Sequence, residues 1–211
     1  MIEGFTMNKF RFRFLVLTSI LVTNAYAFGP ENMLIQKFQA IKTIDAHFQQ
    51  IVFMNGRKIS QSSGHFVVQR PGCMRWAIEK PHPQIFIANG QTIWIYEPEL
   101  KQATKKPQSK GIGGTAGLFL SNQPSLWVQR YKVSLGMSKS LSVFELRAKT
   151  SKTPFSKVIL KFHQDQLVAI EFWDQMGQNS LVELSGVKVN QTVPASAFYF
   201  SLPKHTDVID L

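Results

Sequence analysis

The strongest constraint on the fold is a series of three short apolar segments between Arg70 and Pro98. The first contains Met74 and Trp76 and follows Arg70-Pro71-Gly72; the second is Ile85-Phe86-Ile87, and the third contains the apolar run from Ile93 to Tyr96. Asn89-Gly90 separates the last two, and this pair readily adopts the positive φ angles of a tight hairpin turn. The flanking β-branched and aromatic residues suit a pleated sheet. The sequence therefore predicts three strands here, the last two forming a hairpin.

The third segment is apolar on both of its faces. Ile93, Trp94, Ile95 and Tyr96 follow one another without a polar break. Successive residues of a strand point to opposite sides of the sheet, so each side needs an apolar cover. One side can be the core. A helix, a second sheet or an apolar ligand must cover the other.

The rest of the chain continues this β pattern after one helix. Residues 30–41 are predicted to be helical, because Pro30 lies at the start and Met33, Leu34 and Phe38 are spaced for one apolar face. Further strands are predicted at 45–54, 64–69, 131–135, 141–148, 157–163, 167–173, 181–189 and 198–202. No long helical pattern separates the strands, which excludes parallel βαβ winding. We expect a mainly β fold with a few helices and a large, curved antiparallel sheet.

The first 27 residues have the pattern of a secretory signal peptide. Three basic residues precede the apolar stretch 14–22, which is too short to span a bilayer, and Ala25-Tyr26-Ala27 forms a cleavage site. We expect residues 28–211 to form a single exported domain, whether translation starts at Met1 or Met7. Removing the leader lowers the formal charge from +11 to +9. The only cysteine, Cys73, does not follow the leader, so neither a lipid anchor nor an internal disulfide is expected.

A glycine-rich stretch at 111–117 precedes Leu118, Phe119 and Leu120. It lacks the G-x-x-x-x-G-K-[ST] spacing of a phosphate-binding loop. Glycines before a short apolar helix allow backbone movement, so the stretch predicts a hinged apolar flap. A helix fixed in the core is the alternative.

Motifs for chemistry are missing from the sequence. The five histidines show no metal-ligand spacing, no G-x-S-x-G elbow is present, and Cys73 lies in no catalytic signature. We therefore expect no enzyme, no catalytic residues, no metal and no cofactor. The basic charge favours anionic partners, but an exported protein has little access to nucleic acid, so none is expected.

Several blocks in order along the chain resemble the LolA family of periplasmic outer-membrane lipoprotein carriers. They are Phe48-Gln49-Gln50, Gly64, Arg70-Pro71-Gly72 with Trp76, Pro81, Asn89-Gly90-x-x-Ile-Trp-x-Tyr-x-Pro, Gln102-Ala103-Thr104 and 198–203. The resemblance implies an incomplete antiparallel β-barrel whose concave apolar face is covered by a helical lid. It also implies a monomeric periplasmic chaperone. Such a carrier takes triacylated lipoproteins from an inner-membrane ABC transporter and delivers them to an outer-membrane acceptor.

The resemblance also suggests site residues. Acyl chains would contact Met74, Trp76, Trp94, Tyr96 and the flap residues Leu118, Phe119 and Leu120, and Arg70 would act as a latch that holds the lid closed. Ordinary core positions, and a solvated strand-end arginine, are the alternatives. The family often has an aromatic residue where this chain has Met74.

Two other functions are compatible with the resemblance: an outer-membrane lipoprotein acceptor and a lipoprotein-sensing domain of the same fold. The missing lipidation cysteine disfavours the acceptor. The sensing domain is disfavoured because no second domain is expected after the first.

Overall fold

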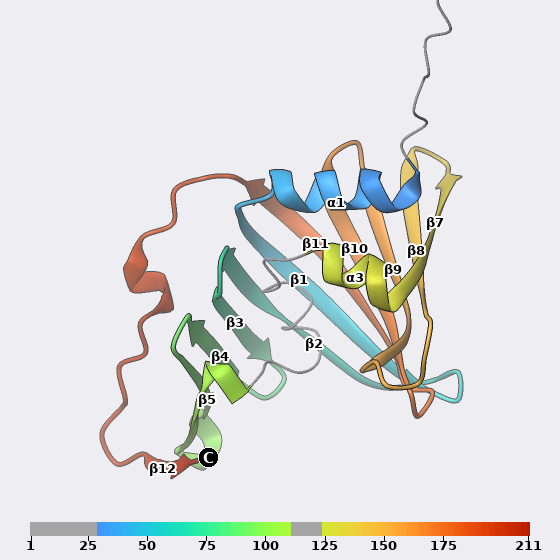
Figure 1. Ribbon diagram of the computed structural model, residues 1–211. Coiled ribbons are helices and arrows are strands. Elements are labelled where there is room, and N and C mark those ends of the chain that lie inside the picture. The colour runs from blue at the N-terminus through green and yellow to red at the C-terminus, as the bar shows by residue number, and fades with distance from the viewer. Residues whose placement is uncertain (1–28, 111–123) are drawn as a thin grey trace, which may run out of the picture.

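The computed structural model describes residues 29–110 and 124–211. Twelve strands form one curved sheet in the order β12-β6-β5-β4-β3-β2-β1-β11-β10-β9-β8-β7 (Figure 1). Their bounds are β1 Thr43–Met54, β2 Arg57–Gln69, β3 Cys73–Lys80, β4 Gln84–Asn89, β5 Thr92–Glu97, β6 Gln102–Pro107, β7 Tyr131–Ser138, β8 Leu141–Ala148, β9 Phe155–His163, β10 Gln166–Asp174, β11 Asn179–Val189 and β12 Asp207–Asp210. β12 and β7 are the two edges, so the sheet does not close into a barrel. The predicted mainly β fold with an unclosed sheet is confirmed.

In the described part of the chain, two α-helices lie on the concave side of the sheet, α1 Pro30–Ala40 and α3 Ser125–Arg130 (Figure 1). Three short 3-10 helices, η1 Pro98–Leu100, η2 Gln108–Lys110 and η3 Ala195–Phe198, lie in connections. Pro30 is compatible with the first helical turn because the amide hydrogen that proline lacks has no intrahelical partner there. Among the residues that the structure describes, no helix combines the length and the apolar character needed to cross a bilayer.

The sequence predicted the antiparallel pattern, which holds everywhere except at one edge. β12 pairs with β6 in parallel, from Asp207 beside Gln102 to Asp210 beside Lys105. The strand predicted at 198–202 is wrong. Phe198 instead ends η3 as a buried residue, and Phe200 packs against Trp94 and Tyr96 on the outer face of the sheet. The aromatic residues at 198 and 200 suggested a strand in the sequence. In the structure they hold this segment against the sheet by side-chain packing and not by strand hydrogen bonds.

The sequence patterns missed one α-helix and two strands of the described residues: α3, β6 and β12. β6 and β12 carry charged side chains at the edge of the sheet, where the alternation of apolar residues is weak. The predicted signal peptide, the glycine-rich stretch and Leu118, Phe119 and Leu120 lie outside the described residues.

The core lies between the helices and the concave face of the sheet. Leu34 and Phe38 of α1 and Trp127 of α3 are buried there, facing the strands. Phe38 packs edge-on against Trp127 at 4.6 Å between ring centroids and against Phe162 of β9 at 6.2 Å. The two helices and the sheet therefore share one apolar interior.

Candidate functional site

An aromatic cluster forms the floor of the concave face where the three strands β1, β2 and β3 meet. The ring centroids of Phe48 and Trp76 are 4.2 Å apart, and those of Phe66 and Trp76 are 5.2 Å apart. Strand register explains the cluster, because Phe66 lies directly opposite Trp76 and both point to the same side. This floor is apolar, and only 9% of Trp76 is exposed.

The same face extends across β4 and β5. Met74 lies opposite Ala88, and Phe86 lies opposite Trp76 and Ile95. Met74 is fully buried, whereas Phe86 and Ile95 are partly buried at the margin of the core. A methionine at position 74 keeps the wall apolar and adaptable, since its unbranched side chain fills irregular space.

The register divides the four strand residues that the sequence placed on one apolar surface. Met74 and Trp76 face the concave side, but Trp94 pairs with Ile87 and Tyr96 with Ile85, on the opposite side of the sheet. Phe200 covers that side, with ring centroids 5.2 Å from Trp94 and 5.5 Å from Tyr96. The second cover that β5 required is therefore the segment of the chain after η3.

Arg70 joins the β2–β3 turn to the end of α1. Its Nη1 donates hydrogen bonds to the carbonyl of Phe38 at 2.5 Å and to the carbonyl of Ile41 at 3.3 Å. The guanidinium also lies over the Phe38 ring, 5.0 Å from the centroid. The last carbonyls of a helix have no intrahelical donor, so a cation placed there satisfies them and complements the helix dipole. Burial lowers the pKa of Arg70 to about 10, so the side chain keeps its charge at neutral pH.

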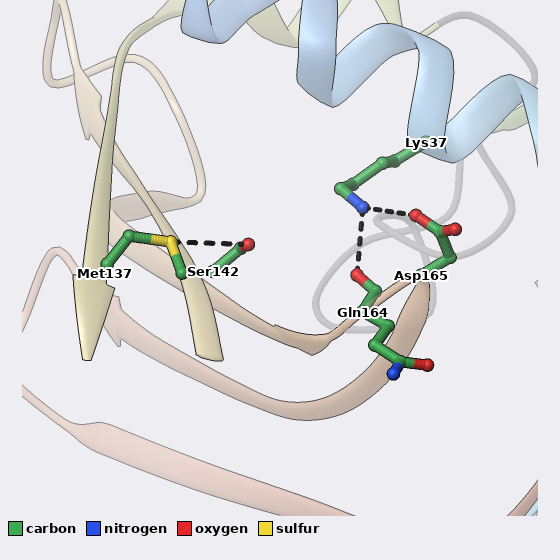
Figure 2. A network of polar contacts seen from close by, with 5 residues as sticks. All are labelled: Lys37, Met137, Ser142, Gln164 and Asp165. Atoms are coloured by element: carbon green, nitrogen blue, oxygen red, sulfur yellow. Dashed lines mark hydrogen bonds and ion pairs between the residues drawn. The ribbon is translucent and has the colours of Figure 1, made fainter. Parts of the chain in front are cut away.

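Two further polar contacts hold α1 from the other half of the sheet. Lys37 Nζ lies 2.7 Å from Asp165 Oδ1 and donates to the Gln164 carbonyl at 3.0 Å, in the β9–β10 turn (Figure 2). Asn190, which follows β11, donates from Nδ2 to the Ala40 carbonyl at 2.8 Å. The Lys37 ammonium holds the pKa of Asp165 below its usual value, mainly through their hydrogen bond. Figure 2 also shows Ser142 Oγ contacting Met137 Sδ, across the β7–β8 hairpin.

These contacts show how α1 is held. Three separate segments outside the helix supply these contacts: Arg70, Asn190 and the β9–β10 turn that binds Lys37. Each contact lies at or beside the C-terminal turn of α1. α1 therefore bridges the concave face with its buried side chains below and its polar contacts at one end. The sequence analysis predicted Arg70 as a latch on a helical lid, and the structure places its guanidinium on carbonyls at the end of α1. Neither Lys37 nor Asn190 was anticipated, because their partners are more than 120 residues away.

Sequence reasoning also missed α3, whose Trp127 is buried against Phe38. Its signal is the apolar run Leu126-Trp127-Val128 after Pro124. A run of three residues is too short to show helical periodicity. Among the described residues, no three histidine, cysteine or acidic side chains are placed to hold a metal ion.

Comparisons with known proteins agree on one family. The family model described as outer membrane lipoprotein carrier protein LolA matches residues 39–201. An outer-membrane lipoprotein carrier protein of Legionella pneumophila (strain Corby) is 40% identical, over 96% of this chain and 99% of its own length. A protein of the same name from Dechloromonas aromatica (strain RCB) is 34% identical, over 80% of this chain and 81% of its own length.

A solved structure supports the fold alone. The crystal structure of an uncharacterized conserved protein from Thermus thermophilus covers 86% of this chain and 97% of its own, with 12% identity and a TM-score of 0.53.

Proposed function

This chain belongs to the outer membrane lipoprotein carrier protein LolA family, and from this premise we propose that its concave apolar face shelters the acyl chains of lipoproteins in transit to the outer membrane. The observation that carries the proposal is the aromatic floor of Phe48, Phe66 and Trp76 beneath two helices. The family name describes a carrier, and we propose no catalytic activity and no cofactor. Both curated relatives are named carriers, which supports a carrier over an acceptor or a sensing domain.

The magnitude of the hydrophobic effect explains why such a shelter is needed. Each buried methylene is worth about 0.8 kcal/mol, so one ~16-carbon chain carries roughly 12 kcal/mol of transfer free energy. That free energy keeps the chain in the membrane unless the carrier offers a comparable apolar surface. Three chains need correspondingly more surface, which we propose is exposed when α1 and α3 move away from the floor.

The helices that cover the floor also make release possible. Leu34, Phe38 and Trp127 fill the concave face when it holds no cargo. Burying three such side chains is worth roughly 5 to 9 kcal/mol. Cargo must replace this packing, so its net affinity falls well below that of a bilayer. The polar contacts of Arg70, Lys37 and Asn190 add to the stability of the covered state and favour release in the same way.

The transport steps follow from this balance. We propose that a periplasmic carrier of this kind receives triacylated lipoproteins from an inner-membrane ABC transporter, with α1 and α3 displaced. It then delivers them to an outer-membrane acceptor as the helices return to the floor, acting as a monomer. The binding surface in this proposal contains Met74 and Trp76. Trp94 and Tyr96 are outside it, because they face the other side of the sheet.

Photo-crosslinking to lipoprotein tests the proposed face directly. A photoreactive phenylalanine replaces Phe86 on the concave margin in one variant and Trp94 on the outer face in a matched variant; the two positions lie on neighbouring hairpin strands. We expect crosslinks to the acyl chains from position 86 and none from position 94. Equal crosslinking from both positions, or crosslinking from position 94 alone, overturns the proposal.

A further inference from the structure

The positive charge of the chain is concentrated in one part of the sequence. Residues 124–158 contain seven lysines and arginines and one acidic residue, Glu145, which is a net charge of +6. The whole chain has a net charge of +11. More than half of the excess therefore lies in the segment from α3 to the start of β9, its connections included.

Three of these cations lie in one row across neighbouring strands. Lys132 of β7 is directly opposite Arg147 of β8, and Arg147 is directly opposite Lys157 of β9. Trp173 of β10 completes the row, with Lys157 Nζ 3.4 Å from its ring centroid. Like charges opposite one another destabilise a sheet, so this arrangement does not serve folding. Arg147 has an ion pair with Glu145, but among the described residues no ion pair involves Lys132 or Lys157.

The row lies near one end of the strands, where several connections between strands come together. The α3–β7 junction and the β8–β9, β10–β11 and β1–β2 connections all lie at this end, because neighbouring strands are antiparallel (Figure 1). Asp174, the nearby acid of the β10–β11 turn, accepts hydrogen bonds from the Met176 and Gln178 amides at 2.9 and 2.8 Å. We call the basic side chains at this end of the sheet the basic rim: Arg57, Lys58, Arg130, Lys132, Arg147, Lys149, Lys152 and Lys157.

Apolar groups accompany the cations of the rim. Met176 in the β10–β11 turn is 82% exposed. A groove of about 320 Å³ opens beside it between that turn and the β1–β2 hairpin, with Phe53, Trp173 and Leu181 among its lining residues. Tryptophan and lysine side chains near exposed apolar groups are typical of surfaces that lie at the lipid–water interface.

We propose that the basic rim docks on the phosphate groups of an anionic lipid bilayer. This inference rests on the proposed function, because a lipoprotein carrier works between two membranes. The cations of the rim come from β2 on one side and from α3, β7, β8, β9 and the β8–β9 connection on the other. They lie at the ends of a row of seven adjacent strands, which at about 4.8 Å per strand is roughly 30 Å along the curve of the sheet. Cations spread over this length match an extended field of phosphates better than a compact acidic pocket of a protein. Electrostatic attraction to such a surface falls off within about 8 Å at physiological salt, so docking is reversible.

Vesicle binding tests the proposal. The purified protein is sedimented with vesicles of phosphatidylglycerol and phosphatidylethanolamine, or with vesicles of phosphatidylcholine alone. The rim variant carries Lys58→Gln, Lys132→Gln and Lys152→Gln. The control variant has the same loss of three charges at Lys80, Lys188 and Lys204, each changed to Gln; all six side chains are exposed.

We expect binding to the anionic vesicles alone, lost at about 1 M salt, where the screening length is about 3 Å. The rim variant should bind about a hundredfold more weakly, given the attraction of anionic lipid for each cation, and the control should bind as the unchanged protein does. Equal weakening of both variants overturns the proposal, because net charge alone then explains the binding. Capture of the unchanged protein by an acidic domain of a transporter, without vesicle binding, also overturns it and identifies a protein partner.

A separate measurement keeps this inference distinct from the carrier function. Both variants should bind a fluorescent acyl probe as the unchanged protein does, since the substituted residues lie away from the concave face. If the unchanged protein fails to bind the probe, the carrier function fails whether or not the rim binds vesicles.

Discussion

At the scale of single residues, Arg70 connects the sheet to the helix above it. It donates two hydrogen bonds to carbonyls at the end of α1 and covers the Phe38 ring. A planar guanidinium can bind several carbonyls at once, whereas an ammonium carries the same charge without the fixed fork. The contacts of Arg70 are therefore suited to hold α1 over the floor.

We predict that Arg70→Leu accepts lipoprotein but fails to pass it on. The covered state loses hydrogen bonds to a charged group, worth roughly 1.5 to 3 kcal/mol each, so release is no longer favoured. Transfer of loaded lipoprotein to the acceptor should fall by at least about tenfold. Arg70→Lys should retain part of the transfer. Normal transfer by Arg70→Leu, with normal thermal stability, would show that these hydrogen bonds are not needed for release.

Gly64 is needed for a close approach between two strands. A Cβ atom at this position would lie 1.9 Å from the Ala77 carbonyl oxygen, beside the register shift between β2 and β3. We predict that Gly64→Ala lowers the free energy of unfolding by about 1 to 3 kcal/mol or prevents folding, since the backbone must move. Gly136→Ala is the control, because a Cβ there meets nothing within 4 Å. Chemical denaturation of both variants measures the difference, and equal stability would contradict the close approach.

At the scale of elements, α1 is held from both halves of the sheet. The Lys37–Asp165 contact connects it to the β9–β10 turn, and the lysine lowers the pKa of the Asp165 carboxyl. A carboxyl whose pKa is lower in the folded state contributes stability above its unfolded pKa and loses this contribution as the pH falls through the folded pKa. Asp165 is almost fully exposed, so the contribution is small and sensitive to salt.

We predict that Asp165→Asn loosens α1 at neutral pH but not in strong acid. At neutral pH its amide protons in α1 should exchange faster than those of the unchanged protein. The two proteins should become alike once the Asp165 carboxyl is protonated. Glu183→Gln on β11 removes an exposed carboxylate that has no ion pair among the described residues, and serves as the control. A difference between Asp165→Asn and the unchanged protein that persists in acid would show that the carboxylate does not act through its charge.

At the scale of the whole molecule, the sheet separates two apolar surfaces. The concave surface contains Trp76 beneath the helices, and the outer surface contains Trp94 beneath Phe200. Adjacent strands contribute to both surfaces, because side chains alternate along each strand. Only the concave surface is proposed to exchange its cover for cargo.

We predict that a bound acyl probe changes the fluorescence of Trp76 and not that of Trp94. Trp76→Phe should reduce the change in tryptophan emission on probe binding, while Trp94→Phe should leave its size intact. Trp76→Ala should also weaken the binding of the probe, since a large part of the floor is lost. An emission change that depends on Trp94 would place the probe on the outer surface.

Much of this architecture was contained in local sequence patterns. The helix at the start, the Asn89-Gly90 hairpin and the strand predicted at 141–148 agree with α1, the β4–β5 hairpin and β8. The two apolar faces of β5 correctly required two covers. These features depend on periodicity and turn chemistry, which act over a few neighbouring residues and can be recognised in the sequence.

Tertiary structure alone decided which cover belongs to which face and which residues hold α1. The alternation of side chains shows that Trp76 and Trp94 each face one side of the sheet, but only the strand register shows that they face opposite sides. Lys37 reaches Asp165 across 128 residues of sequence. The cations of the basic rim come together only because antiparallel strands return to the same end of the sheet. Contacts between distant segments depend on the path of the whole chain, and no local pattern encodes that path.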